Sequence, residues 1–238
     1  MTTEVPEGAD AASVFSLGDE TEDAGMDTEA LQGALRMLFL LDRAGSEPQP
    51  GSHAESVGAV AVITAERKLQ ALHFWMRNPD YLAYELLCCV EAGQLDNDWI
   101  GIAEGLLEGE EPELRRYPML RHRFGAYEPI DDSFSYLAAA GLAECHRSGA
   151  PGQVQRTDLY LLARGRDTAN QIVADHAELR WYSDRAEMVA TVGRTLTGYA
   201  AKNRQYELSE YAQTQLGDRI EPVADVVREK LEELRPTA

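Results

Sequence analysis

The sequence predicts a mainly α-helical fold that carries one small β-hairpin, and the signals that predict it lie in residues 115–166. A short amphipathic helix is expected at about 131–140, where apolar side chains recur at intervals of three and four residues. Two apolar runs follow, 142–146 and 158–163, and the Gly, Pro and Ser residues between them are typical of a hairpin with a wide tip. Helix, hairpin and a further helix in this order predict the second half of a winged helix-turn-helix.

The short helix has recognisable ends. Asp131 or Asp132 can cap its first turn, because an aspartate side chain accepts hydrogen bonds from the free N–H groups there. Gly141 is expected to end it, since glycine readily adopts the left-handed conformation that often follows a helix. The first strand of the hairpin is therefore expected to begin at Leu142.

Composition divides the chain into three parts. Residues 1–26 combine acids with Gly, Ala, Ser and Thr and show almost no apolar periodicity, so they predict a disordered acidic leader. Residues 27–166 predict a winged-helix-like domain. Residues 167–238 predict a helical extension.

Three longer helices are expected ahead of the hairpin, at about 28–44, 65–78 and 81–92. Asp27 or Thr28, Thr64 and Asp80 are their expected caps. Residues 57–63 form too short a run of small side chains to assign.

The C-terminal extension carries two long helical patterns, at about 167–202 and 206–234, and Pro222 would split or kink the second. Their apolar faces could pair with those of a second copy and make a homodimer. They could equally pack back on the same chain.

The charge of the chain is extreme. Its formal net charge is -19, from 22 basic and 41 acidic residues, and lysine accounts for only three of the basic ones. A surface rich in Asp and Glu and poor in Lys keeps its water and ions at very high salt, where self-repulsion is screened. A halophilic cytoplasm is the favoured explanation, and an acidic surface for a basic partner is the alternative.

No pattern predicts an enzyme. Cys88, Cys89 and Cys145 have no metal-ligand spacing with each other or with the five histidines. A glycine-rich phosphate loop and a nucleophile elbow are both missing, so we expect no catalytic residue, no metal and no cofactor. The chain also lacks a bilayer-length apolar run and a signal peptide, which predicts a cytoplasmic protein without a membrane partner.

Two short motifs are similar to those of a known family. Residues 68–75 read KLQALHFW, and residues 124–127 read FGAY, followed by a helix and Gly-Leu at 141–142. Over roughly residues 30–165 the chain resembles the YwgA-type proteins and the related Panacea (SocA) antitoxin-like domains. Those carry a Lys-Leu-Gln stretch and a Tyr-Gly-Pro-Tyr turn ahead of a short helix.

The chain departs from that family at Ala126, where proline is usual, at Glu128, where serine is usual, and in a long acidic insertion between the two motifs. The family has no catalytic residues to transfer. The resemblance implies a helical, winged-helix-like adaptor, regulator or antitoxin.

A locally basic segment in so acidic a chain suggests binding to double-stranded DNA. Residues 115–166 contain eight arginines and only five acidic residues, and arginines on a wing can contact phosphates. An objection is that the short helix would present Asp131 and Asp132 to the major groove, where acids repel phosphate. The candidate nucleic-acid contacts are Arg115, Arg116, Arg121, Arg123, Arg147, Arg156, Arg164 and Arg166.

The second hypothesis is a protein-interaction adaptor or antitoxin-like module without DNA binding. Aromatic side chains anchor many interfaces. The candidates for partner contacts are Trp75, Tyr81, Tyr84 and Trp181.

Overall fold

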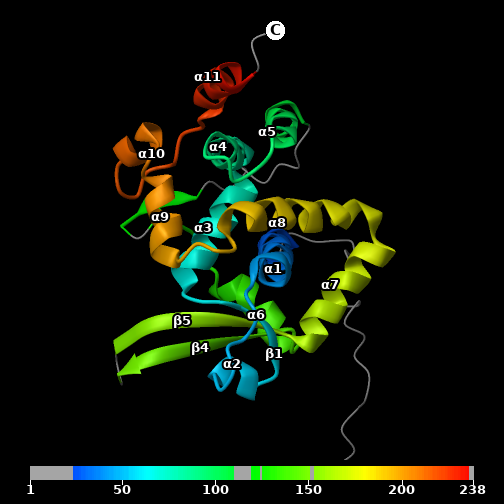
Figure 1. The fold of residues 1–238 in the computed structure, drawn as a ribbon. Coiled ribbons are helices and arrows are strands. Elements are labelled where there is room, and N and C mark those ends of the chain that lie inside the picture. Colours follow the sequence, from blue (N-terminus) through cyan, green and yellow to red (C-terminus); the bar gives the residue numbers. More distant parts are fainter. Residues whose placement is uncertain (1–23, 110–118, 124, 151–152, 236–238) are drawn as a thin grey trace, which may run out of the picture.

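The computed structural model describes residues 24–109, 119–123, 125–150 and 153–235 (Figure 1). Its helices are α1 (Ala24–Ala44), α2 (His53–Ser56), α3 (Glu66–Arg77), α4 (Pro79–Glu91), α5 (Asp98–Glu108), α6 (Asp131–Ala139), α7 (Ala163–Asp175), the 3-10 turn η2 (Ala177–Leu179), α8 (Arg180–Gly193), α9 (Gly198–Gln205), α10 (Ser209–Gln213) and α11 (Ala224–Leu234). Its strands are β1 (Ala59–Ile63), β2 (Leu120–His122), β3 (Gly125–Tyr127), β4 (Ala143–Ala150) and β5 (Gln153–Leu162).

Helices α1 and α3 form the centre of the molecule. α1 packs against α3, α6, α7 and α8, and its residues 33–41 are all buried. α3 is buried from residue 68 to residue 77. In Figure 1 these two helices and α8 lie between the sheet and the group formed by α4, α5 and α11. Since the middle of α1 has no solvent-facing side, its sequence there is apolar almost all round.

Two glycines let helices approach closely at this centre. A Cβ atom on Gly193 would lie 2.3 Å from Leu72 Cδ2, so α8 can contact α3 only because that position has no side chain. A Cβ atom on Gly33 would lie 2.1 Å from Ser133 Oγ, where α1 meets α6. Both distances are far shorter than a carbon–carbon or carbon–oxygen contact, so a larger residue would separate the helices.

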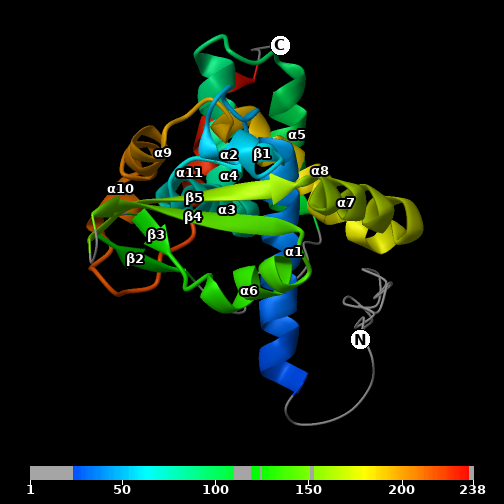
Figure 2. The same ribbon diagram turned by 90° about the horizontal axis from the view of Figure 1, so that it is seen from below.

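The main sheet is antiparallel, with strand order β1-β5-β4. β1 lies in the run of small residues that the sequence left unassigned. β2 and β3 form a separate two-stranded ribbon. Figure 2 shows this ribbon beside the free end of the β4–β5 hairpin.

The predicted hairpin is confirmed as part of a mainly helical fold, but its predicted wide tip is wrong. β4 continues to Ala150 and β5 begins at Gln153, so the strands extend through most of the residues expected to form a loop. Pairing across the hairpin stabilises the polar run in both strands. Gly141 has a φ of +66°, which fits its expected place after the short helix α6.

The two long C-terminal helices are also different from the prediction. The first pattern is divided into α7, η2, α8 and α9, and the second gives only α10 and α11. α8 packs on α1, α9 on α3 and α11 on α4. Much of the apolar surface of these two patterns is therefore used within the chain, although Tyr199 and Leu216 are exposed.

The expected helix ends need four corrections. Asp131 and Asp132 lie inside the first turn of α6, and the residue before it is Ile130, without a side-chain cap. α1 begins at Ala24, ahead of the expected cap, and residues 1–23 of the predicted leader lie outside the described residues. The residue before α3 is Ala65, without a side-chain cap, in place of Thr64. Asp80 lies inside the first turn of α4, and its buried carboxylate accepts the N–H of Val223 at 2.8 Å. None of the described helices is long and apolar enough to cross a membrane.

Candidate docking site

A pocket of about 480 Å³ opens between the start of α3, the β2–β3 ribbon and the outer part of β5. Its lining contains apolar and charged side chains, and the charged or titratable ones are two arginines, one histidine and one glutamate. The lining residues are Ala65, Glu66, Arg67, Gln70, His122, Gly125, Ala126, Tyr127, Val154, Gln155, Arg156 and Thr157.

The turn at Ala65 shapes one wall of the pocket. Ala65 has a φ of +69°, a conformation that side-chain-bearing residues rarely adopt, and it is the only non-glycine residue with a positive φ in the described ranges. Its N–H donates a 2.9 Å hydrogen bond to the buried carboxylate of Asp158 on β5. This bond holds the chain at the point where it leaves β1 and turns into α3.

Two glutamines hold the β3 segment against the helices. Gln70 of α3 donates to the carbonyl oxygen of Glu128 at 2.7 Å and accepts from its N–H at 3.2 Å. Gln205 of α9 accepts the N–H of Ala126 at 3.2 Å. The pocket wall is therefore fixed by hydrogen bonds to backbone, which join the motif at 68–75 to Glu128, the residue after the motif at 124–127.

A buried polar network lies behind this wall. Arg36 Nε donates to His73 Nε2 at 2.8 Å, so the neutral imidazole carries its proton on Nδ1, which lies 3.9 Å from Glu128 Oε2. Arg77 forms an ion pair with the same carboxylate. Burial, together with the positive charges of Arg36 and Arg77, holds the pKa of His73 well below its usual value. Burial also lowers the pKa of Arg77 to about 10.

Two large exposed apolar side chains, Tyr127 and Val154, line the pocket, and others lie on neighbouring elements. In the described ranges five large apolar side chains are exposed, and each lies on the side of the molecule that carries the β2–β3 ribbon, the end of the hairpin and α9. Their exposed fractions are 45% for Leu120, 39% for Tyr127, 62% for Val154, 66% for Tyr199 and 63% for Leu216.

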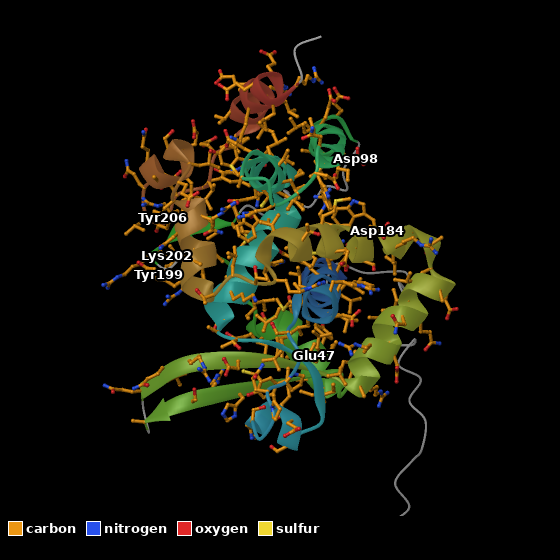
Figure 3. All side chains as sticks on the ribbon, in the orientation of Figure 1. Glu47, Asp98, Asp184, Tyr199, Lys202 and Tyr206 are labelled. Carbon is orange, nitrogen blue, oxygen red and sulfur yellow. The ribbon has the colours of Figure 1, made fainter. Side chains whose placement is uncertain are left out.

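Pairing explains why these residues lie together. Leu120 is opposite Tyr127 in the ribbon. The turn that carries Leu216 is joined to β2, because the N–H of Gly217 donates to the carbonyl of Arg121 at 2.8 Å. Figure 3 places Tyr199 on α9, on the same side as the hairpin end. We name Leu120, Tyr127, Val154, Tyr199 and Leu216 the apolar rim.

The arginines predicted to contact DNA do not form one surface. Arg115 and Arg116 lie outside the described residues. Arg121 donates to the carbonyl of Thr214 and lies over the ring of Tyr206, and Arg166 forms an ion pair with Asp42 at 3.0 Å. Both of these arginines tie elements together.

The remaining arginines are more exposed. Arg147 lies 3.7 Å from Asp131 and Arg156 lies 2.9 Å from Asp158, so both hairpin arginines face a carboxylate. Arg123 is exposed beside the ribbon. Arg164 is exposed at the start of α7, which follows the end of β5 opposite to the hairpin tip. The exposed side of α6 carries Asp131 and Asp132.

The aromatic residues predicted to contact a partner lie mostly inside the molecule. Trp75 and Tyr81 have exposed fractions of 0% and 2%, so both belong to the core and neither is available to a partner. Tyr84 and Trp181 are half-buried against that core. Trp75 and Tyr81 fill the centre because α3 has neighbours on all sides.

Sequence reasoning missed the apolar rim. Tyr127 belongs to a recognised motif, but its exposure could not be inferred. It depends on pairing with Leu120, and no pattern around residue 120 predicted a strand there. Val154 stood in the expected loop. Residues 153–157 contain only one apolar side chain, so no alternation of polar and apolar residues indicated a strand beside the neighbouring Gly and Pro.

The described ranges contain no group of three or more His, Cys, Asp or Glu side chains that could hold a metal ion. No family model, curated protein or solved structure matches the chain.

Proposed function

We propose that this protein is a non-enzymatic interaction module that binds a partner protein through the pocket and its apolar rim. The single observation that carries this proposal is that two exposed apolar side chains, Tyr127 and Val154, line one pocket, and that Leu120 lies opposite Tyr127. Scattered apolar residues are normal on a surface, whereas a cluster that surrounds a concave site is typical of interfaces. The polar side chains in the pocket would give such an interface its orientation.

We also propose a winged-helix arrangement for the core. α1, β1, α3, α6, β4 and β5 follow one another in the order of a winged helix, and the sheet order β1-β5-β4 is compatible with it. In this interpretation α4, α5 and the ribbon are inserted between the second and third helices. An adaptor or antitoxin-like role agrees with the resemblance to the YwgA-type and Panacea domains.

DNA binding is the less well supported proposal. It requires exposed positive charge on the hairpin and on α6, because phosphate contacts supply most of the affinity for DNA. Arg147 and Arg156 each face a carboxylate, and α6 presents two aspartates. The apolar rim would have no role on a phosphate backbone.

The test uses the double variant Leu120→Asp/Tyr127→Asp. Two charges on the ribbon should weaken partner binding strongly, because the new carboxylates would lose their water in the interface. Both side chains are exposed in the free protein, but the two new charges would lie opposite each other in the ribbon, so circular dichroism and thermal unfolding must first show that the variant keeps the fold. Partners recovered from the native host by crosslinking to the full chain would be identified, purified and titrated against both proteins.

The matched control is Asn170→Asp/Gln171→Glu, which adds the same two charges on exposed positions of α7. It should bind the purified partner like the unchanged chain. If the ribbon variant binds equally well, the pocket is not the docking site. If the purified partner is a DNA duplex, the protein-binding function is wrong.

A further inference from the structure

β5 has a free edge beside the pocket. β4 pairs with β5 along residues 153–161, but β1 pairs only with residues 159–162. Among the described residues, positions 153–158 of β5 therefore have a strand neighbour on one side only. An unpaired edge is a template on which another extended chain can add.

The pairing of β1 shows which backbone groups of β5 face this free side. Val62 exchanges both of its backbone hydrogen bonds with Ser46, on the side of β1 away from β5. Its pair with Tyr160 is thus a non-hydrogen-bonded one, and the backbone groups of Tyr160 face β4. Because these directions alternate along a strand, the N–H and C=O of Leu159 and of Thr157 face the side of β1.

Leu159 is opposite Ile63, the last residue of β1, whereas Thr157 lies beyond the end of β1. The strained turn at Ala65 takes the chain away from β5 at this point, and the Asp158 carboxylate fixes that turn. The pocket adjoins this part of β5, because Thr157, Arg156, Gln155 and Val154 are among its lining residues. A free edge and a cavity thus lie side by side.

We propose that an extended segment of the partner protein adds to β5 as a further strand at residues 153–158, in line with β1, and exchanges backbone hydrogen bonds with Thr157. This inference rests on the proposed function and specifies its mode of binding. The edge of six residues spans roughly 20 Å, which is the length of an ordinary strand. Strand addition of this kind gives affinity through backbone bonds and specificity through side-chain pockets.

The lining defines the chemistry of that segment. Tyr127 and Val154 are exposed apolar walls, so the segment should place an apolar side chain between them. Arg67, Arg156 and Glu66 also line the pocket, and Arg156 already pairs with Asp158 at 2.9 Å, so the charges of the lining give no preference for an acidic residue in the segment.

The experiment compares Thr157→Pro with Thr157→Val in the full chain. Proline removes the one N–H that the partner strand needs, and this N–H makes no bond to β4, so the hairpin should keep its pairing. Valine keeps the N–H and the branched shape of threonine. Thermal unfolding and circular dichroism of both variants would confirm that the fold is retained.

The probes are random peptides of about ten residues displayed on phage, slightly longer than the six-residue edge that spans roughly 20 Å. They are selected on the full chain, and the enriched sequences are synthesised and titrated. Enriched peptides should contain an apolar residue. They should bind Thr157→Val normally and bind Thr157→Pro about tenfold more weakly, because the backbone hydrogen bond to the Thr157 N–H is lost.

N-methylation of single backbone amides in the best peptide provides a readout that needs no variant protein. Methyl groups at alternate positions should abolish binding, and those at the positions between should be tolerated, since only every second amide faces β5. If all N-methylated peptides bind, or if Thr157→Pro binds like Thr157→Val, strand addition is wrong.

The two proposals fail differently. If Tyr127→Asp lowers peptide binding and Thr157→Pro does not, the pocket is a docking site that recognises side chains without strand pairing. If neither change matters, or if the full chain enriches no peptide, both the strand addition and the proposed function are overturned.

Discussion

At the scale of single residues, His73 is the side chain whose burial has the clearest consequence. Its pKa is held well below the ordinary value by desolvation and by Arg36 and Arg77. In the unfolded chain the imidazole binds a proton below a pH of about 6.5. Between that value and its lower folded pKa, the unfolded state therefore binds more protons than the folded one, and stability must fall as the pH falls.

We predict that His73→Gln flattens this dependence. A glutamine can still accept a hydrogen bond from Arg36, but it does not titrate. Between about pH 7 and pH 5 the free energy of unfolding of the unchanged chain should drop by up to about 2 kcal/mol more than that of the variant. Urea unfolding at several pH values measures both slopes. Asn170→Gln, an exposed change that involves no titratable group, is the control and should leave the slope as it is.

Ala65 gives a second prediction at this scale. Its positive φ strains an L-residue, and glycine relieves that strain while adding some entropy to the unfolded chain. Ala65→Gly should raise the free energy of unfolding by about 0.5–1 kcal/mol. Ala138→Gly, on the exposed side of α6, should lower it by a similar amount. A loss of stability at both positions would mean that the turn at Ala65 is not strained.

At the scale of elements, the sequence predicts what local pattern controls and misses what distant contacts control. The α6–Gly141–β4 succession and the central helices could be recognised because their periodicity and end signals are local. β1 could not, since a run of small residues becomes a strand only when β5 lies beside it. The break between α7 and α8 at His176 is marked by neither Gly nor Pro, so nothing in the sequence announces it.

The candidate site follows the same division. Gln70 and Glu128 belong to recognised motifs, yet their mutual hydrogen bonds join residues 58 positions apart. The proposed role of Thr157 depends on the direction of alternate backbone groups, which we infer from the pairing of β1 with Ser46. Such a site cannot be found from residue types, because its essential atoms belong to the backbone.

At the scale of the whole molecule, the net charge of -19 has to be reconciled with a compact fold. Repulsion among the acids opposes folding, and it acts over about 10 Å at 0.1 M salt but only about 3 Å at 1 M. Helix α11 shows the problem locally, because Glu229, Glu232 and Glu233 are all exposed on a helix of eleven residues. Adaptation to a salt-rich cytoplasm is our proposal for why the chain tolerates this.

We predict that the melting temperature rises as KCl is increased from about 0.1 M to 2 M. Salt screens the repulsion among acidic side chains, and this repulsion is stronger in the compact folded state than in the unfolded chain. The triple variant Glu229→Gln/Glu232→Gln/Glu233→Gln should be more stable than the unchanged chain at low salt, since it removes three like charges and keeps good helix-forming residues. The difference between the two proteins should shrink towards zero at high salt. Calorimetry over the salt series tests both statements.

Salt can also stabilise a protein by strengthening apolar burial. In that case the melting temperatures of the two proteins would rise in parallel, with a constant difference between them. A constant gap would therefore assign the salt response to the core, and the acidic surface would need an explanation other than screening.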